Sequence, residues 1–252
     1  MKNLIVAVLV LSLFSCAENK NDKIGAIKKE IVPVRKDSTT TTVTPHFDGR
    51  CNIDNDVAQL GIGMVIVPLK FALYDDSLLR GEPQLVDMYE KYDSLNNVCS
   101  CVFDPEYGLM HFACTGKTDR AYRVLINYSQ VKWLPREKEY QFKSWEQYIE
   151  GSFGIKRKTT TDSTRTPIGL VRKEPSEGAD TISIPAGHEM FCAMQVKGDW
   201  VKVQYDCFYN QENNPNEGQP CHNYINKCTN PVTGWLRWRQ DNKQLIEIFL
   251  MP

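Results

Sequence analysis

The chain has 252 residues, and its 30 basic and 31 acidic side chains leave a formal net charge of −1. This balance provides no broad positive field, so the sequence excludes nucleic acid as an expected partner. The length allows one or two domains, and nine cysteines favour an oxidising compartment over the cytosol.

The first 15 residues have the pattern of a signal peptide. Lys2 precedes an uncharged, mostly apolar run from Leu4 to Phe14, which is shorter than the ~20 residues of a membrane-spanning helix. The run ends in Leu13-Phe14-Ser15-Cys16, which resembles the bacterial lipobox. The resemblance implies cleavage before Cys16 and lipidation of its thiol, and Ala17 after it implies the outer membrane, on its periplasmic side or at the cell surface. The alternative is an ordinary signal peptide with a chance cysteine.

A flexible tether is expected over residues 16–58, because the low-complexity stretch from Asp37 to Pro45 cannot bury a core. Two groups of short β-prone segments follow, at residues 59–156 and 169–252. A Thr-rich linker is expected between them, at residues 157–168.

Alternating apolar residues predict strands at Tyr122–Tyr128 and Trp200–Tyr205. Ser144, with Gln147 three residues later, predicts the start of a short helix through a capping box. The 28 residues from Asp206 to Thr233 are rich in Asn, Pro and Gly and contain three cysteines. They are expected to form a long loop between two strands, here called the excursion.

Four blocks of the second unit stand in a characteristic order: Val171-Arg172, Pro175-Ser176, Asp199-Trp200-Val201-Lys202-Val203 and Gly234-Trp235-Leu236, with Ile182 and Gly187 between them. Together they resemble the bacterial SH3 (SH3b) family, which implies a small β-barrel. The excursion replaces the tight hairpin that the family has before its closing Gly-Trp.

The first unit resembles a diverged copy of the second. The expected correspondences are Tyr122–Ile126 with Trp200–Gln204, Val131–Pro135 with Thr233–Arg237, and Phe71–Leu73 with Leu170–Arg172. The resemblance therefore implies a mainly β fold of two small SH3-like β-barrels in tandem, with long loop insertions and little helix.

Eight cysteines follow Cys16, and an even number in an exported chain predicts disulfides. Cys207 and Cys228 flank the excursion and are expected to pair, and Cys221 is then expected to reach Cys192. Cys51 and Cys114 are the expected partners of Cys99 and Cys101, in either combination. A zinc site at Cys207, Cys221, His222 and Cys228 is the alternative, but their spacing lacks the tight ligand pairs that zinc uses.

The sequence predicts no catalytic residue, metal or cofactor. A cysteine nucleophile needs a histidine beside it in space, whereas Cys221 and His222 are merely neighbours in sequence. His111 and His188 lie in β-rich stretches, where a structural role is the commoner one.

Aromatic residues are the best binding candidates. Trp238 stands between Arg237 and Arg239 and is expected to be exposed, since aromatic residues and arginine make binding hot spots. Trp200 and Trp235 belong to the SH3b pattern and serve either packing or binding. Further candidates in the excursion are Tyr209 and Tyr224.

The resemblance implies a non-catalytic envelope lipoprotein whose SH3-like modules bind a peptidoglycan stem peptide or an envelope protein. Two alternatives remain at this point. One is an accessory subunit or remnant of a cell-wall hydrolase, and the other is a structural spacer of a surface complex.

Overall fold

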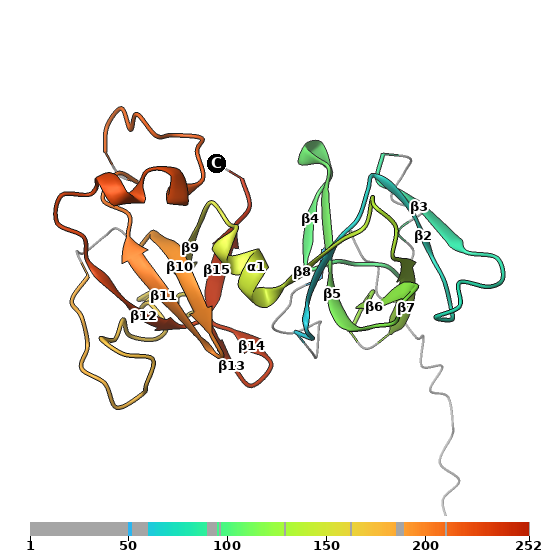
Figure 1. The fold of residues 1–252 in the computed structure, drawn as a ribbon, viewed down its shortest axis with the longest axis horizontal. Helices are drawn as coiled ribbons and strands as arrows, with labels where there is room; N and C mark the ends of the chain where they lie inside the picture. The colour runs from blue at the N-terminus through green and yellow to red at the C-terminus, as the bar shows by residue number, and fades with distance from the viewer. Residues whose placement is uncertain are drawn as a thin grey trace, which may run out of the picture. The chain divides into compact units, whose positions relative to one another are not determined.

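The computed structural model describes residues 50–51, 60–89, 95, 97–128, 130–161, 163–184, 189–209 and 211–251. The expected signal peptide, Cys16 and almost all of the expected tether lie outside these ranges, as does Gly187 of the SH3b pattern. The described part is mainly β (Figure 1). None of its helices has the length and hydrophobicity needed to cross a membrane.

The first sheet is antiparallel and has the strand order β7-β6-β5-β1-β8, with β4 also paired to β5. A separate hairpin of β2 and β3 lies in the segment that joins β1 to β5. The bounds are β1 Gly63–Ile66, β2 Lys70–Leu73, β3 Gln84–Asp87, β4 Val102–Asp104, the 3-10 helix η2 Pro105–Tyr107, β5 Leu109–Lys117, β6 Ala121–Leu125, β7 Val131–Pro135 and β8 Gln141–Ser144.

The second sheet is also antiparallel, with the order β12-β11-β10-β9-β15. The excursion between β11 and β12 contains two 3-10 helices, η3 and η4, and a short hairpin of β13 and β14 precedes β15. The bounds are β9 Gly154–Arg157, β10 Phe191–Lys197, β11 Trp200–Tyr205, η3 Cys221–Asn223, η4 Ile225–Lys227, β12 Thr233–Arg237, β13 Arg239–Gln240, β14 Lys243–Gln244 and β15 Ile246–Phe249.

The helix α1 (Trp145–Glu150) begins at the expected capping box. Ser144 Oγ accepts a hydrogen bond from the backbone N–H of Gln147 at 3.3 Å, and Gln147 Oε1 accepts one from the N–H of Ser144 at 3.1 Å. Two of the otherwise unpaired N–H groups of the first turn are thereby satisfied.

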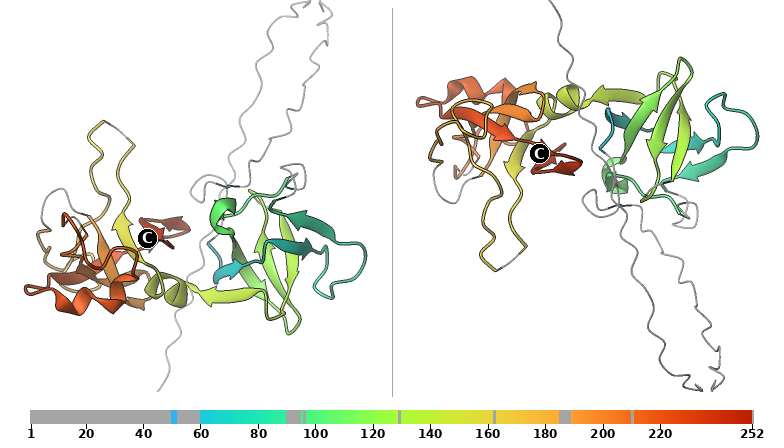
Figure 2. Two further views of the ribbon diagram at one scale, coloured as in Figure 1. Left: turned by 90° about the horizontal axis from the view of Figure 1, so that it is seen from above. Right: turned by 90° about the horizontal axis from the view of Figure 1, so that it is seen from below.

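Strand β9 covers the end of the expected first unit and the beginning of the expected linker. It pairs with β10 and β15, so it belongs to the second sheet. The remaining linker residues fold back as a hairpin in which Thr159 pairs with Pro167. Both views of Figure 2 show this yellow hairpin projecting from the second sheet.

The two sheets share one topology. Apart from β4, which is additional in the first sheet, each has five strands in the same spatial order, and the last of these five along the chain lies beside the first. In this described part of the chain the strand pairings leave both sheets open at their edges, so neither is a closed barrel.

A β-bulge also occurs at the same place in both sheets. The second strand carries one extra residue against the third, at Thr115 in β5 and at Met194 in β10. Arg123 and Lys202 occupy the same position beside the two bulges. A bulge bends and twists its strand at one defined position, so the two sheets share their register as well as their order.

The same register places equivalent side chains in the cores. Val65 pairs with Phe112 across β1 and β5, and Ile155 pairs with Phe191 across β9 and β10. All four are fully buried. Burying each such side chain contributes about 1.5–3 kcal/mol relative to leaving it exposed, so these pairs are central to both sheets.

In both sheets the chain that leaves the first strand, β1 or β9, pairs briefly with the edge strand, β7 or β12. Tyr74 and Trp133 exchange two backbone hydrogen bonds of 2.9 Å each, and Arg172 and Trp235 exchange two of 2.9 and 2.7 Å. Each exchange satisfies backbone groups at a strand that is otherwise an edge.

These pairings shift two of the expected correspondences by one residue, whereas the match of Val131–Pro135 with Thr233–Arg237 agrees with the observed register. Tyr74, rather than Leu73, is the equivalent of Arg172, and Ala121, rather than Tyr122, is the equivalent of Trp200. The reason is the pleat of a strand, because a shift by one residue exchanges its two faces. In the corrected register Tyr122 matches Val201, and both are buried.

Trp238 is buried, contrary to expectation, with 1% of its surface exposed. Its Nε1 donates to the carbonyl of Gly198 at 2.8 Å, and its backbone N–H donates to Asp199 at 2.9 Å. The chain after β12 thus continues along the β10–β11 turn instead of leaving the sheet, and this turns the indole into the core.

We expect Trp238→Ala to lower the free energy of unfolding by about 3–5 kcal/mol, because it removes a large buried side chain and leaves a cavity. Chemical denaturation measures the loss. Tyr209→Ala is the control, since Tyr209 is exposed and surface substitutions usually change stability by less than about 0.5 kcal/mol. A loss below about 1 kcal/mol for Trp238→Ala would contradict the core position.

His111 is buried in β5, and its Nδ1 lies 2.8 Å from the hydroxyl of Tyr148. Burial, with a smaller contribution from the positive charge of Lys143, lowers the pKa of His111 from 6.5 to about 4. The folded state therefore holds the imidazole neutral at pH values where the unfolded chain protonates it.

Stability is expected to fall as the pH drops from about 6.5 to about 4, because the unfolded state then binds a proton that the folded state does not. The free energy of unfolding is expected to fall by about 3 kcal/mol in total, since each unit of pKa difference between the folded and unfolded states corresponds to 1.36 kcal/mol. Denaturant unfolding at several pH values measures it. His111→Gln should flatten the profile in this range, and an unchanged profile would exclude His111 as the cause.

Candidate functional site

The disulfide Cys192–Cys221 fixes the excursion to β10 of the second sheet, and Cys207–Cys228 closes the base of the excursion itself. Both pairs were expected from the sequence. Beneath them, Tyr224 and Ile225 complete a small separate core. A hydrogen bond of 2.8 Å from Gln204 Nε2 in β11 to the carbonyl of Ile225 adds a polar contact to the sheet.

A cavity of about 560 Å³, here called the loop cavity, lies between the excursion and the end of the second sheet. Its apolar lining comes from residues at or next to the ends of β9, β10 and β15: Phe153, Met190, Phe249 and Met251. Its remaining lining, which is largely polar, comes from the excursion: Asp206, Tyr209, Gln211, Asn213, Asn214, Asn216, Glu217, Gly218, Gln219 and Tyr224.

Asp206 is the buried acid of the cavity, with 2% of its surface exposed. Its Oδ1 accepts from the backbone N–H of Phe208 at 2.9 Å, and its Oδ2 accepts from the hydroxyl of Tyr224 at 2.8 Å. Burial and this hydrogen bond raise the pKa of Tyr224. Tyr224 therefore stays a neutral donor, and the two bonds fix the orientation of the carboxylate.

Asn216 is the buried amide of the cavity, with 4% of its surface exposed. Its backbone N–H donates to Asn214 Oδ1 at 2.9 Å, and its Oδ1 accepts from Lys227 Nζ at 3.4 Å. Its Nδ2 finds no acceptor among the residues that the structure describes. A buried donor without a partner costs free energy, so a ligand acceptor would be stabilising here.

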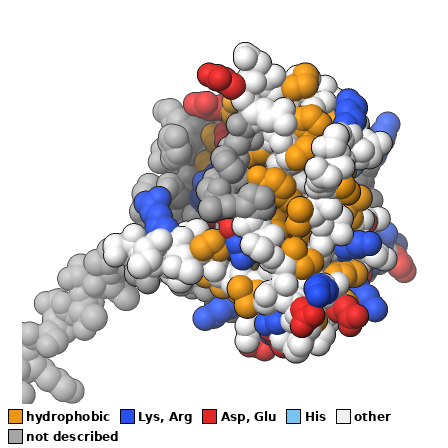
Figure 3. All heavy atoms as spheres, turned by 90° about the vertical axis from the view of Figure 1, so that its left-hand side faces the viewer, with side chains coloured by type: hydrophobic (Ala, Val, Ile, Leu, Met, Phe, Trp, Pro, Cys, Tyr) orange, Lys and Arg blue, Asp and Glu red, His pale blue; other side chains and the backbone are white. Residues whose placement is uncertain are grey.

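Of the aromatic candidates, Tyr209 and Tyr224 both line the loop cavity. Tyr209 is exposed at its rim, whereas Tyr224 is buried. Trp200 and Trp235 are half-buried on β11 and β12 and do not belong to the cavity lining. Figure 3 shows hydrophobic and charged side chains interspersed on one face of the molecule, without a field of a single sign.

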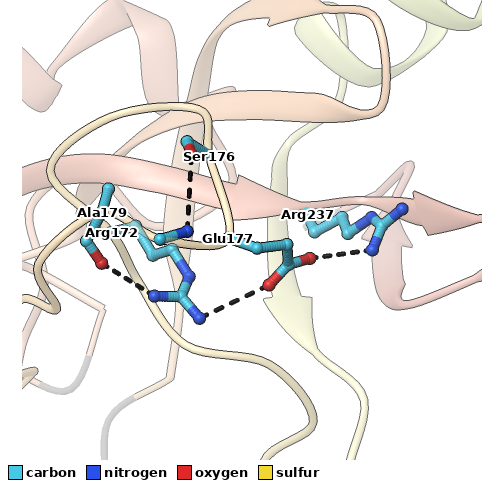
Figure 4. Close-up of polar contacts among 6 residues, drawn as sticks. Arg172, Ser176, Glu177, Ala179 and Arg237 are labelled. Carbon is cyan, nitrogen blue, oxygen red and sulfur yellow. Dashed lines mark hydrogen bonds and ion pairs between the residues drawn. The ribbon is translucent and has the colours of Figure 1, made fainter.

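The two arginines beside Trp238 form ion pairs within the protein. Arg237 donates to Glu177 at 2.8 Å, and Glu177 also accepts from Arg172 (Figure 4). Arg239 donates to Asp199 at 2.6 Å, and its guanidinium lies over the Trp238 ring. With Trp238 buried, the expected Arg-Trp-Arg binding surface is not formed.

The remaining cysteines pair only in part. Cys51 bonds to Cys99, which was one of the two expected combinations, but Cys101 and Cys114 are free thiols. The reason is that Cys101 and Cys114 pack in different clusters, one with Trp145 and the other with Phe112. Burial raises their pKa values to about 12 and about 11, so neither thiol is a ready nucleophile.

The zinc alternative is wrong, because Cys207, Cys221 and Cys228 are all oxidised. Cys221 for the same reason provides no thiolate for His222. Sequence reasoning located the excursion but did not single out Asp206 or Asn216. Their only signal was the polar composition of this loop, since their burial depends on how it folds back.

We expect alkylation of the denatured, non-reduced protein to label Cys101 and Cys114 and none of the six bonded cysteines. In the native protein both thiols should react slowly, because their raised pKa values leave little thiolate and Cys114 is also buried. Peptide mapping by mass spectrometry assigns the labels. A bond between Cys101 and Cys114, or label on Cys207 or Cys228, would contradict this assignment.

No protein-family model, curated protein or solved structure matches the chain.

Proposed function

We propose that this protein is a non-catalytic lipoprotein of the outer membrane with two tandem SH3-like modules, of which the second binds a peptidoglycan stem peptide. The loop cavity carries the proposal. Its lining combines apolar side chains with amide and carboxylate side chains. Arg172, Trp200 and Trp235 of the SH3b pattern do not line this cavity.

The SH3-like assignment is supported by where the sequence blocks fall. Asp199–Val203 forms the β10–β11 turn and most of β11, and Gly234-Trp235-Leu236 lies within β12. Val171-Arg172 lies beside β12 through the backbone bonds of Arg172 to Trp235. The first sheet repeats the strand order, the bulge and this backbone exchange, which supports a second module of the same kind.

The envelope location is supported by the lipobox-like end at Cys16 and by the disulfides. Three disulfides in the described residues suit an exported protein, because the cytosol keeps thiols reduced. Two or three acyl chains at the mature N-terminus hold a protein firmly on a bilayer. The anchored protein would then extend on its tether toward the cell wall or the cell exterior.

The stem-peptide assignment follows from the size and lining of the cavity. A volume of about 560 Å³ lies within the range of roughly 300–1,000 Å³ that is common for small ligands. Asn214 and Asn216 offer both donors and acceptors to peptide groups. The apolar lining from Phe153 and Met190 accommodates small aliphatic side chains.

The proposal is tested by titrating soluble muropeptides into the protein in a calorimeter. Tyr209→Ala should weaken binding about tenfold or more, because an aromatic residue at a pocket rim is a typical hot spot. Tyr107→Ala is the matched control, since Tyr107 is likewise exposed but lies in η2 of the first unit. Equal affinity of the two variants for muropeptides would contradict the loop cavity as the binding site.

The same protein is then incubated with purified cell wall. Release of fragments with new amino groups or reducing ends would overturn the non-catalytic assignment and favour a hydrolase. Retention of an envelope protein without any binding of muropeptides would overturn the ligand class.

A further inference from the structure

The loop cavity carries negative charge that the described residues around it do not balance. Its lining contains Asp206 and Glu217 but no lysine, arginine or histidine. Lys227 reaches the cavity region only through its bond to Asn216 Oδ1. An anionic ligand is therefore disfavoured, whereas a cationic group is attracted.

Of the two acidic side chains, Asp206 has the greater need for a counter-charge, because it is buried whereas Glu217 is exposed. Both donors to its carboxylate, the N–H of Phe208 and the hydroxyl of Tyr224, are neutral. No ion pair joins Asp206 to another described residue. Burying a charge without a counter-charge is costly, so a cation in the cavity stabilises this arrangement.

Asn216 adds an independent observation that also indicates a ligand. Its side chain is more than nine-tenths buried, it lines the same cavity, and its Nδ2 has no acceptor within the described part of the chain. The N–H groups of Nδ2 can only donate. The cavity thus needs a ligand that brings both a positive charge and a hydrogen-bond acceptor.

Among wall components, a stem peptide with a diamino acid meets both needs. Its free side-chain amine is positively charged at neutral pH, and its peptide carbonyls accept hydrogen bonds. We propose that the loop cavity selects its ligand by this ammonium group, held near Asp206 and Glu217, while Asn216 Nδ2 donates to a peptide carbonyl. This inference rests on the proposed function and narrows its ligand class.

Two synthetic stem peptides test the proposal, one with a free diamino-acid side-chain amine and one with that amine acetylated. Acetylation removes the charge and leaves the rest of the peptide unchanged. In calorimetric titrations the free amine should bind the native protein about tenfold or more tightly, since hydrogen bonds to charged groups are the stronger ones. Preference for the acetylated peptide, or equal affinity, would overturn the selection by charge and leave stem-peptide binding standing.

Glu217→Gln should reduce the preference for the free amine while leaving the fold intact, because Glu217 is exposed. Glu212→Gln is the matched control, since Glu212 lies in the same excursion and is exposed but does not line the cavity. Asp206→Asn should reduce the preference further, with the Tm of the variant measured alongside. An unchanged preference in both Glu217→Gln and a folded Asp206→Asn would overturn the roles of these acids.

Two further measurements distinguish ammonium recognition from a failure of the proposed function and from a metal site. Absence of binding for both peptides would overturn the proposed function, and this inference with it. Titration with calcium chloride alone checks the other cation that carboxylate and amide oxygens accept. Tight binding of Ca²⁺ that excludes the free-amine peptide would assign the cavity to a metal instead.

Discussion

The loop cavity depends on the covalent attachment of the excursion to the second sheet. This segment is rich in Asn, Pro and Gly, and its own core consists of little more than two disulfides, Tyr224 and Ile225. Ordering each residue of such a loop costs about 1–2 kcal/mol of backbone entropy, which so small a core does not offset. The disulfides reduce the freedom of the unfolded loop instead, so an almost entirely polar wall can be held in place.

The two sheets show which features of this fold tolerate sequence change. They share strand order, the bulge at Thr115 and Met194, and the buried pairs Val65–Phe112 and Ile155–Phe191. Their long connections differ. The first unit has its longest insertion between its first and second strands, whereas the excursion of the second lies between the third and fourth. Binding residues are commonly carried by loops on a rigid scaffold, and the binding site proposed at the loop cavity is of this kind.

Much of the local structure could be predicted from the sequence. Alternation placed β11 at Trp200–Tyr205, the capping box placed the start of α1, and the flanking positions of Cys207 and Cys228 indicated their bond. These signals are local, because pleat, cap and loop closure act over short stretches.

The failures involve contacts between distant segments. Trp238 was expected to be exposed because its neighbours are arginines, yet Gly198 and Asp199 draw the chain inward. Two of the three expected matches between the units were offset by one residue, because strand pairing between distant segments, rather than the local sequence, sets the register. Asp206 and Asn216 are buried because the excursion folds back on the second sheet. No short-range sequence pattern predicts this burial.

The Cys51–Cys99 bond has a mechanical consequence. It lies where the described fold begins, and beside it the backbone N–H of Cys51 donates to the carbonyl of Ser100. In the proposed lipoprotein, tension from the tether would enter the described fold at this point. A hydrogen-bonded edge would peel open one bond at a time, whereas the disulfide passes the load directly to residue 99. If the proposed anchor holds the protein, this disulfide protects the described fold from unravelling at its N-terminal side.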